Sequence, residues 1–438
     1  MKRTLFVCLL ILATKIIYAQ DISYLWNLYN EGYYSEALEL ALPLCEDYPE
    51  NPELKLLIGR IYTDQGHFED AIPYLNFAIE MDINNSWIKG WGLVYAGVCY
   101  YTIGEYVSAE TNLNNCIALN ATVNSSDYAR YLLKVFGFDS YYDQYLVIEK
   151  EHILFHFHPQ SLSYIENVDI YTNRRVEAFD SLAGFFGAEL PKKVDYFIWH
   201  SRGEAYTLLN RNLGFAIPSG SLIHSYYNQT SGHELTHVIS YHMGDNLKTT
   251  LFINEGTAVY FDMSNRSKIQ MARDAVKNLG YIDIIDIWQN SSLSEEYLYP
   301  ISGAFIEYLI VHEGKDKFLE FFLNQTIENA YVVYGQNFDQ IVDGFEALFS
   351  DLVTSNANFL SQDFIIYPNP CRDFFYLKSD MNYEKMVLSI FDLTGKLLLS
   401  QTIVQKETLI DISTLNSGTY ILKIVTNEEV VLRNITKY

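Results

Sequence analysis

The chain has 438 residues, with 30 Lys and Arg against 54 Asp and Glu, which gives a formal net charge of −24 and a pI near 4.7. A field of that sign repels phosphates, so the composition argues against a nucleic-acid binder and against docking on anionic lipid headgroups. Hydrophobic residues make up 49% of the chain, which excludes a disordered polyanion, and at about 150 residues per domain the length predicts two or three domains.

The N-terminus has the layout of a secretory signal peptide. Lys2 and Arg3 precede the apolar run Leu5–Ala13, and Ala19 provides the small residue at the expected cleavage site. A membrane anchor is the weaker alternative, because a span needs about 20 apolar residues. We expect residues 1–19 to be removed from an exported protein. They hold three basic residues and no acid, so the charge becomes −24 − 3 = −27.

Residues 20–140 are predicted to form helical repeats. Gly32–Ala37 recurs as Gly66–Ala71 at an offset of 34 and as Gly104–Ala109 at a further offset of 38, with the four extra residues placed in Asp82–Trp91. The 34-residue period resembles the tetratricopeptide repeat, in which glycine permits a tight turn and alanine lets two helices pack closely. An irregular bundle is the alternative. Such a stack either binds a peptide or protein partner or braces its own catalytic domain.

The segment 145–350 starts with strands and continues with helices, which indicates an α+β fold. We expect strands within Leu146–Phe157, at Val194–Trp199 and at Gly214–Ile223, the last interrupted at 218–220. Helices are expected at Val168–Phe186, Thr230–Met243, Phe252–Met263, Ser267–Asn278 and Tyr299–His312.

One helix of this segment carries the residue pattern of a metal site. His233 and His237 are four residues apart and therefore share a helix face, and Glu234 projects from the same side. Glu255 follows His237 with 17 residues between them, a length that lets a second, antiparallel helix bring it to the metal. Catalytic zinc takes three protein ligands and leaves one position for water. The expected helix limits are Thr230 or Ser231 at the start and Gly244 at the end.

The motif His-Glu-x-x-His, followed by Asn254-Glu255-Gly256 on a second helix, resembles the gluzincin metallopeptidases and most of all their peptidase-MA-like branch. The resemblance covers about residues 145–350. Tyr299–Phe305 is similar to the later Tyr-x-x-x-Gly helix of the family, and Gly214–Ile223 to the edge strand that precedes the zinc helix. The resemblance implies one catalytic Zn²⁺ and the ligands His233, His237 and Glu255.

The same resemblance implies the catalytic roles. Glu234 would be the general base that takes a proton from the zinc-bound water and later delivers one to the leaving amine. Tyr299 would donate a hydrogen bond to the tetrahedral oxyanion, with Tyr297 as a weaker candidate. The edge strand would pair with an extended peptide substrate by strand addition.

The sequence departs from its relatives at two points. It lacks the Gly-x-Met-x-Asn segment that gluzincin aminopeptidases use near the substrate amine, so an endopeptidase is the expectation. Val259 stands four residues after Glu255, where thermolysin-like enzymes have Asp. The partner that orients the zinc histidines is therefore not identified from the sequence.

Other histidines lie near these elements. His156 and His158 are two residues apart, so they face the same side of a strand, and with His152 they could form another metal site. We favour strand residues near the cleft, because no carboxylate partner is apparent in the sequence. His224 and His242 flank the zinc motif, either supporting it or serving a structural purpose.

Residues 364–438, after a polar linker at 351–363, are predicted to form a small β-sandwich of short strands. The segment resembles the type A C-terminal sorting domain of the type IX secretion system, and a carbohydrate- or protein-binding sandwich is the alternative. The resemblance implies secretion or surface attachment through that machinery. The matching motifs are Tyr367-Pro368-Asn369-Pro370, Asp392–Lys396, Asp411–Leu415, Ser417–Tyr420 and Lys437-Tyr438.

The sequence therefore predicts a multidomain, secreted or surface-attached zinc metallopeptidase whose repeats dock a partner or substrate. A catalytically inactive, peptidase-like scaffold of the cell envelope is the alternative, and a maturation factor with one dedicated partner is a third hypothesis. Four cysteines remain after signal removal, either buried thiols or partners in a disulfide: Cys45, Cys99, Cys116 and Cys371.

Overall fold

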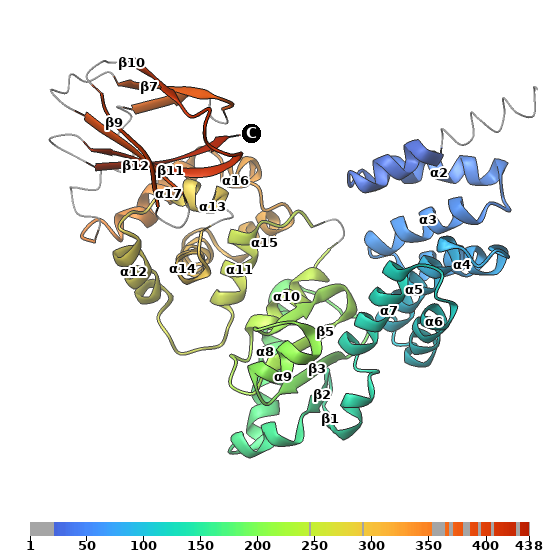
Figure 1. Ribbon diagram of the computed structural model, residues 1–438. Helices are drawn as coiled ribbons and strands as arrows, with labels where there is room; N and C mark the ends of the chain where they lie inside the picture. The colour runs from blue at the N-terminus through green and yellow to red at the C-terminus, as the bar shows by residue number, and fades with distance from the viewer. Residues whose placement is uncertain are drawn as a thin grey trace, which may run out of the picture. The chain divides into compact units, whose positions relative to one another are not determined.

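The computed structural model describes residues 22–244, 247–290, 293–352, 364–367, 371–379, 386–392, 396–403, 407–425 and 430–437. These residues form two compact units (Figure 1). The first contains the chain up to Arg266 and returns at Ile306–Gly335, and the second contains Ser267–Phe305 and the chain from Gln336 onward. The predicted signal peptide and most of the predicted linker lie outside the described residues.

The first unit begins with helices that each pack against the next, as the repeat pattern predicts. The turns of the three repeats lie at Gly32, Gly66 and Gly104, whose φ values of +83°, +84° and +85° are readily adopted only by glycine. The alanine five positions after each glycine is fully buried, which permits the close helix contact. After a helix over residues 22–30, the helices are α2 (Tyr34–Asp47), α3 (Pro52–Asp64), α4 (Phe68–Met81), α5 (Trp87–Thr102), α6 (Tyr106–Leu119) and α7 (Val123–Val135).

The four extra residues between the turns at Gly66 and Gly104 lie where the sequence placed them. Helix α5 has 16 residues where α3 has 13, so three of the four lengthen the helix. The remaining one lengthens the preceding loop, which spans 82–86 compared with 48–51 between the turns at Gly32 and Gly66. Helices α3 and α5 both end two residues before the next turn glycine, so the three extra helical residues are Trp87–Lys89 at the start of α5. The prediction that all four lie within Asp82–Trp91 is therefore confirmed.

A five-stranded sheet follows, in the order β1-β2-β3-β5-β4, with the inner pairs β2–β3 and β3–β5 parallel and the outer pairs antiparallel. All six residues of β3 are buried, as expected of the central strand. The short β4 lies at the edge, and a 3₁₀ turn at Pro218–Gly220 interrupts the chain where predicted. The strands are β1 (Leu146–Glu149), β2 (Ile153–Phe157), β3 (Val194–Trp199), β4 (Phe215–Ile217) and β5 (Leu222–Tyr226).

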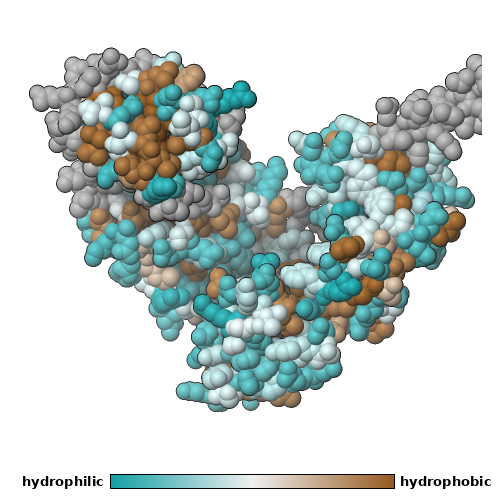
Figure 2. All heavy atoms as spheres, in the orientation of Figure 1, coloured by the Kyte–Doolittle hydropathy of each residue, from teal (hydrophilic) through white to brown (hydrophobic). Residues whose placement is uncertain are grey.

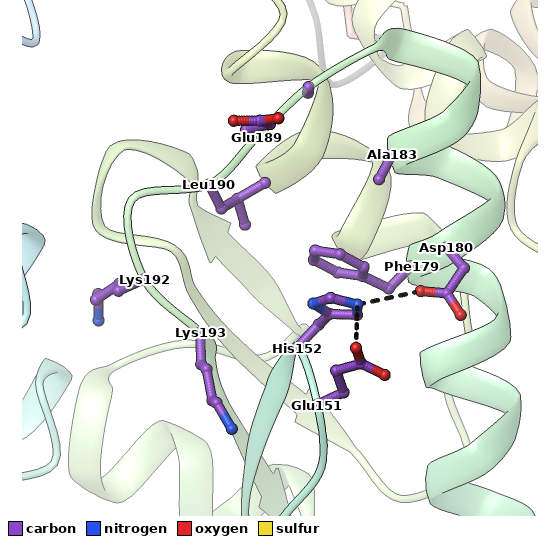
Figure 3. A pocket seen from close by; sticks show the side chains of 10 residues that line it. Glu151, His152, Phe179, Asp180, Ala183, Glu189, Leu190, Lys192 and Lys193 are labelled. Carbon is purple, nitrogen blue, oxygen red and sulfur yellow. Dashed lines mark ion pairs between the residues drawn. The ribbon is translucent and has the colours of Figure 1, made fainter.

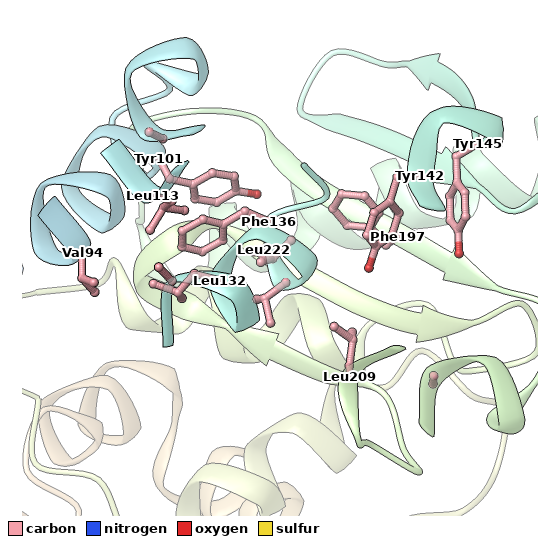
Figure 4. Close-up of a cluster of buried hydrophobic side chains, with 14 of the residues drawn as sticks. Val94, Tyr101, Leu113, Leu132, Phe136, Tyr142, Tyr145, Phe197, Leu209 and Leu222 are labelled. Atoms are coloured by element: carbon pink, nitrogen blue, oxygen red, sulfur yellow. The ribbon is translucent and has the colours of Figure 1, made fainter. Parts of the chain in front are cut away.

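The last repeat and the sheet share one hydrophobic core, shown in Figure 4. Tyr101 of α5 stacks on Phe136, with ring centroids 3.9 Å apart, and Phe197 of β3 and Leu222 of β5 belong to the same cluster. Because helices and strands contribute to one buried cluster, the repeats brace the sheet that follows them.

A buried carboxylate reinforces this junction. Asp195 of β3 accepts hydrogen bonds from the hydroxyls of Tyr101 and Tyr106, both at 2.9 Å, and from Lys192 Nζ at 2.6 Å. His156 Nε2 lies 3.1 Å from its other oxygen. The Asp195 side chain is 5% exposed, so one charge deep in the protein holds groups from two repeat helices and two strand regions.

The remaining helices carry the site and extend into the second unit. Helix α14 runs from Glu295 to Glu313 and so includes residues of both units. The helices are α8 (Val168–Phe186), α9 (Arg202–Leu209), α10 (His233–Tyr241), α11 (Leu251–Tyr260), α15 (Lys315–Phe322) and α16 (Ile327–Tyr334) in the first unit, and α12 (Lys268–Leu279), α13 (Ile284–Gln289) and α17 (Asn337–Ala347) in the second.

The C-terminal strands form two antiparallel sheets with the orders β10-β7-β6 and β12-β11-β8-β9. Phe375 and Ile410 of the first sheet share a core with Leu388 and Leu422 of the second, which is the predicted sandwich. Figure 2 shows hydrophobic side chains gathered on one face of this domain. Pro368–Pro370, 393–395 and Tyr438 of the predicted motifs lie outside the described residues. The strands are β6 (Phe364–Tyr367), β7 (Phe374–Ser379), β8 (Met386–Phe391), β9 (Leu397–Ile403), β10 (Glu407–Asp411), β11 (Gly418–Val425) and β12 (Val430–Lys437).

The four cysteines are buried free thiols, so no disulfide links them. Among the described residues, no helix combines the length and the apolar character needed to cross a membrane.

The buried imidazole of His224 predicts an acid-sensitive fold. Burial lowers the pKa of His224 to about 3, although a hydrogen bond to the carbonyl of Val135 at 2.8 Å partly offsets the effect. In the unfolded chain the ring binds a proton near pH 6.5, so stability should fall as the pH falls from about 6.5 towards 3. We expect urea unfolding of a His224→Phe variant to lose less stability between pH 7.5 and pH 4.5 than the wild type does. An equal loss in both proteins would contradict this prediction.

Candidate metal centre

Helix α10 presents the two predicted imidazole ligands side by side. It packs against α8, α11 and β5, which hold its orientation. The side chain of His233 is 22% exposed and that of His237 is 11% exposed, so both are partly accessible to solvent. Their ring centroids lie 5.2 Å apart, as expected for residues one helical turn apart.

Helix α11 brings the third predicted ligand to the same point. Glu255 Oε2 lies 3.5 Å from Nε2 of His233 and 3.5 Å from Nε2 of His237. The loop between α10 and α11 therefore places the carboxylate as the sequence spacing predicts. The three candidate ligand atoms all lie within 4.8 Å of one another.

These separations fit a tetrahedral zinc ion. With zinc–ligand bonds of about 2.0–2.1 Å, two ligand atoms in a tetrahedron lie about 3.3–3.4 Å apart. The two measured distances of 3.5 Å are close to that value, whereas a hydrogen-bonded pair would be nearer 2.8 Å. The donor set of two imidazoles and one carboxylate also matches catalytic zinc sites.

Electrostatic interactions within the cluster shift the pKa values of Glu255 and His233. Burial alone would raise the pKa of Glu255, but the adjacent imidazoles of His233 and His237 outweigh it and hold that pKa well below its ordinary value. Burial alone would lower the pKa of His233, but Glu255 and Glu234 raise it above the ordinary value. The carboxylate is therefore ionised at neutral pH, as a metal ligand must be.

Glu234, the predicted general base, lies against this cluster without belonging to it. It is 6% exposed, and burial raises its pKa although His233 and His237 partly offset the effect. A carboxylate whose pKa is shifted upwards towards neutrality suits a group that must both take and release a proton.

Two supporting residues were not assigned from the sequence. The amide group of Asn254 lies 3.3 Å from Nδ1 of His237, so it occupies the place of a partner that orients this ring. The buried carboxylate of Asp262 raises the pKa of His233. Asn254 was visible in the motif as the residue before Glu255, but its contact depends on how α10 and α11 cross.

The start and end of α10 differ from the prediction. The N-cap is Gly232 with no side-chain cap, and the C-cap is His242, so Thr230, Ser231 and Gly244 do not bound the helix. A Cβ atom on Gly232 would lie 1.9 Å from the carbonyl oxygen of Phe261. The helix starts at a glycine because the chain after α11 crosses too close for any side chain.

Tyr299 and Tyr297 lie on α14 within the second unit, whereas the three ligands and Glu234 belong to the first. Both side chains are half-buried, and the backbone carbonyl of Tyr299 accepts a hydrogen bond from Ser302. Their proposed role at the oxyanion stays a prediction.

His152 does not join the other histidines of the β2 region. Its ring stacks on Phe179, with centroids 4.6 Å apart, and Nε2 lies 3.5 Å from Asp180 and 3.9 Å from Glu151. Figure 3 shows these groups at the wall of a surface pocket. The hypothesis of one metal site built from His152, His156 and His158 is therefore wrong.

His156 and His158 point to the same side of the sheet, as their spacing predicts, but each faces its own carboxylate. His156 pairs with Asp195, and His158 Nε2 lies 3.9 Å from Glu204. The expectation that these residues lack carboxylate partners is wrong, because both carboxylates come from β3 and α9, far along the chain.

The two flanking histidines are structural. His224 is fully buried and bonds to the carbonyl of Val135, and it stacks between Phe197 and Phe215. His242 lies 3.2 Å from the carbonyl of Pro218. Both link the sheet to neighbouring segments and neither reaches the ligand cluster.

Removing the third ligand should weaken metal binding more than any substitution outside the cluster. We expect Glu255→Ala to lose zinc affinity by more than the 10–100-fold that loss of an outer-shell partner costs. Competition with a chromophoric zinc chelator measures this. Glu177→Ala, an exposed position on α8, is the matched control and should bind as the wild type does. Unchanged metal content in Glu255→Ala would remove Glu255 from the ligand set.

Comparison with known proteins bears on the C-terminal segment. A family model described as the secretion system C-terminal sorting domain matches residues 365–437. The C-terminal region is a secretion-system sorting domain. Its match confirms the localisation predicted from the sequence: the protein is exported, and it is secreted or attached to the cell surface by way of the type IX machinery.

No curated protein matches the chain. Among solved structures, the crystal structure of PcrH in complex with the chaperone binding region of PopD matches with 22% identity and a TM-score of 0.24, over 26% of this chain and 84% of that chain. A likeness at this TM-score has no bearing on function.

Proposed function

We propose that the protein is a secreted or surface-attached zinc metallopeptidase. The observation that carries the proposal is the convergence of His233, His237 and Glu255, with both imidazole Nε2 atoms 3.5 Å from one carboxylate oxygen and Glu234 buried beside them. Bound zinc would lower the pKa of a water molecule to about 7 and polarise the scissile carbonyl.

The side chains of this chain would perform the proton transfers. Glu234 would take a proton from the attacking water and deliver one to the nitrogen of the leaving amine. Asn254 would hold the ring of His237, and Tyr299 would donate to the oxyanion. Each of these roles can be tested by a separate substitution.

The substrate would bind as an extended peptide. Strand β4 lies at the edge of the sheet, and α10 packs against both β4 and β5, so a strand added at β4 would lie near the site. The chain lacks the residues with which related aminopeptidases hold a free amine. We therefore propose an endopeptidase that cleaves within polypeptides.

The repeats would dock the substrate or a partner protein. A groove of about 990 Å³ lies between the repeat turn at Asp64–Asp70 and the end of α10 at Tyr241 and His242. The guanidinium of Arg60 faces aromatic rings of neighbouring repeat helices. Both features suit a polypeptide ligand, which combines apolar and charged side chains.

Cleavage of unfolded casein by the purified protein tests the proposal. Activity should disappear on chelation and return when zinc is added in stoichiometric amount. Correctly folded protein that binds no zinc at the His233 cluster would contradict the proposal and favour an inactive scaffold of the cell envelope.

A further inference from the structure

A second group of metal-ligand side chains lies at the carboxyl ends of two neighbouring strands. β2 and β3 run parallel, and His158 and His200 are the residues that follow them. Since parallel strands end at the same edge of a sheet, both imidazoles meet there, where α/β proteins commonly bind ligands. Glu204 reaches the same edge from the first turn of α9.

The three side chains converge closely. Glu204 Oε2 lies 2.6 Å from Nδ1 of His200, and Glu204 Oε1 lies 3.9 Å from Nε2 of His158. The two rings have centroids 4.4 Å apart. One ligand atom from each residue can be chosen so that all three lie within 4.8 Å of one another, as in the His233 cluster.

The contact between His200 and Glu204 is not an ordinary hydrogen bond. His200 Nδ1 is buried, and within the described part of the chain it makes no hydrogen bond, although the carboxylate oxygen is 2.6 Å away. Its ring proton or lone pair does not point at that oxygen. A buried Nδ1 without a hydrogen bond points to a ligand. Two zinc ligands lie about 3.3–3.4 Å apart, so His200 and Glu204 would have to separate slightly to hold an ion.

Hydrogen-bond donors hold the Glu204 carboxylate in place, as they do for carboxylates that bind metals. Tyr141 donates to Glu204 Oε1 at 3.0 Å, Tyr145 donates to the same oxygen, and the backbone N–H of His200 donates to Oε2 at 2.8 Å. The Glu204 side chain is 1% exposed, so these donors fix a carboxyl group that is shielded from water. Such outer contacts orient ligands and raise metal affinity.

We propose that His158, His200 and Glu204 form a second zinc site, separate from the His233 cluster and independent of the proposed peptidase function. Two imidazoles and a carboxylate suit zinc. The His200 side chain is 24% exposed, so solvent can supply the fourth ligand. The ion would tie β2, β3 and α9 together and would stabilise the sheet.

Zinc binding requires a local rearrangement. The backbone N–H of Gln160 donates to Nδ1 of His158 at 3.1 Å, and this caps the 3₁₀ turn at Pro159–Tyr164. A metal on Nε2 places the ring proton on Nδ1, where it can no longer accept this bond. The N–H of Gln160 is therefore released when zinc binds, which gives the site a signature of its own.

Zinc stoichiometry in the full chain tests the proposal. Titration against a chromophoric chelator should give about two equivalents for the wild type and about one for His200→Ala, with His67→Ala, an exposed histidine of the repeats, as the matched control. His233→Ala should also lose one equivalent, and only if the first site exists. Equal zinc binding by the wild type and His200→Ala would overturn the second site and leave the first untouched.

Hydrogen exchange of the wild type decides the question if His200→Ala fails to fold. Zinc should raise amide exchange at Gln160 and lower it in α9 around Glu204. Unchanged exchange in both segments at saturating zinc would overturn the proposal.

Discussion

Glu234→Gln should abolish peptide hydrolysis while leaving zinc bound. Glutamine keeps the shape of the side chain but cannot take the proton from the attacking water, and such proton transfer contributes about 10²–10⁴-fold to a rate. We expect kcat for casein-derived peptides to fall by at least about a hundredfold, with zinc stoichiometry unchanged because Glu234 is not a ligand. Initial rates and metal analysis on the same preparation measure both effects.

The matched control is Glu177→Gln, which makes the same change at an exposed position of α8. Its rate and its zinc content should equal those of the wild type. Full cleavage by the Glu234→Gln protein would refute the proposed mechanism. Loss of zinc from that variant would instead show that Glu234 helps to hold the ion.

Asp195→Asn should destabilise the first unit by about 3–5 kcal/mol, the usual cost of removing one partner from a buried ion pair. The substitution leaves Lys192, whose side chain is 7% exposed, without its counter-charge. It also puts an amide where Tyr101 and Tyr106 each need an acceptor. Urea unfolding followed by tryptophan fluorescence measures the change.

Combining Asp195→Asn with Lys192→Met is the control, because replacing both charges removes the unpaired ammonium. The double variant should recover part of the lost stability. The effect also depends on pH. Burial would raise the pKa of Asp195, but His156 and Lys192 hold it well below its ordinary value, so its contribution is present above about pH 4 and is lost as the pH falls. A loss of less than 1 kcal/mol at pH 7 would contradict the prediction.

Local patterns were enough to predict several elements. The limits of α8 and β3 match the prediction at both ends, because a long amphipathic run and a continuous apolar run leave few alternatives. The His233 cluster was predictable for a related reason, since helix periodicity fixes two ligands and a short loop fixes the third.

Features that depend on contacts between distant segments were not predictable. The start of α10 is set by the carbonyl of Phe261, which reaches Gly232 from the next helix. The His158, His200 and Glu204 group exists because β2 and β3 pair in parallel, and nothing in the spacing of these residues reveals that pairing. Asn254 combines the two situations. Its place beside Glu255 is evident from the sequence, whereas its contact with His237 depends on how α10 and α11 cross.

The core that the last repeat shares with the sheet has a consequence for how the protein unfolds and how it can be divided. Deleting α5–α7 would expose apolar side chains of β3 and β5 to water, so a fragment that begins at the sheet should aggregate. The last repeat and the sheet should melt in one cooperative transition. The smallest autonomous fragment that contains the His233 cluster should therefore include the last repeat helices, α5–α7, which are not an independent module.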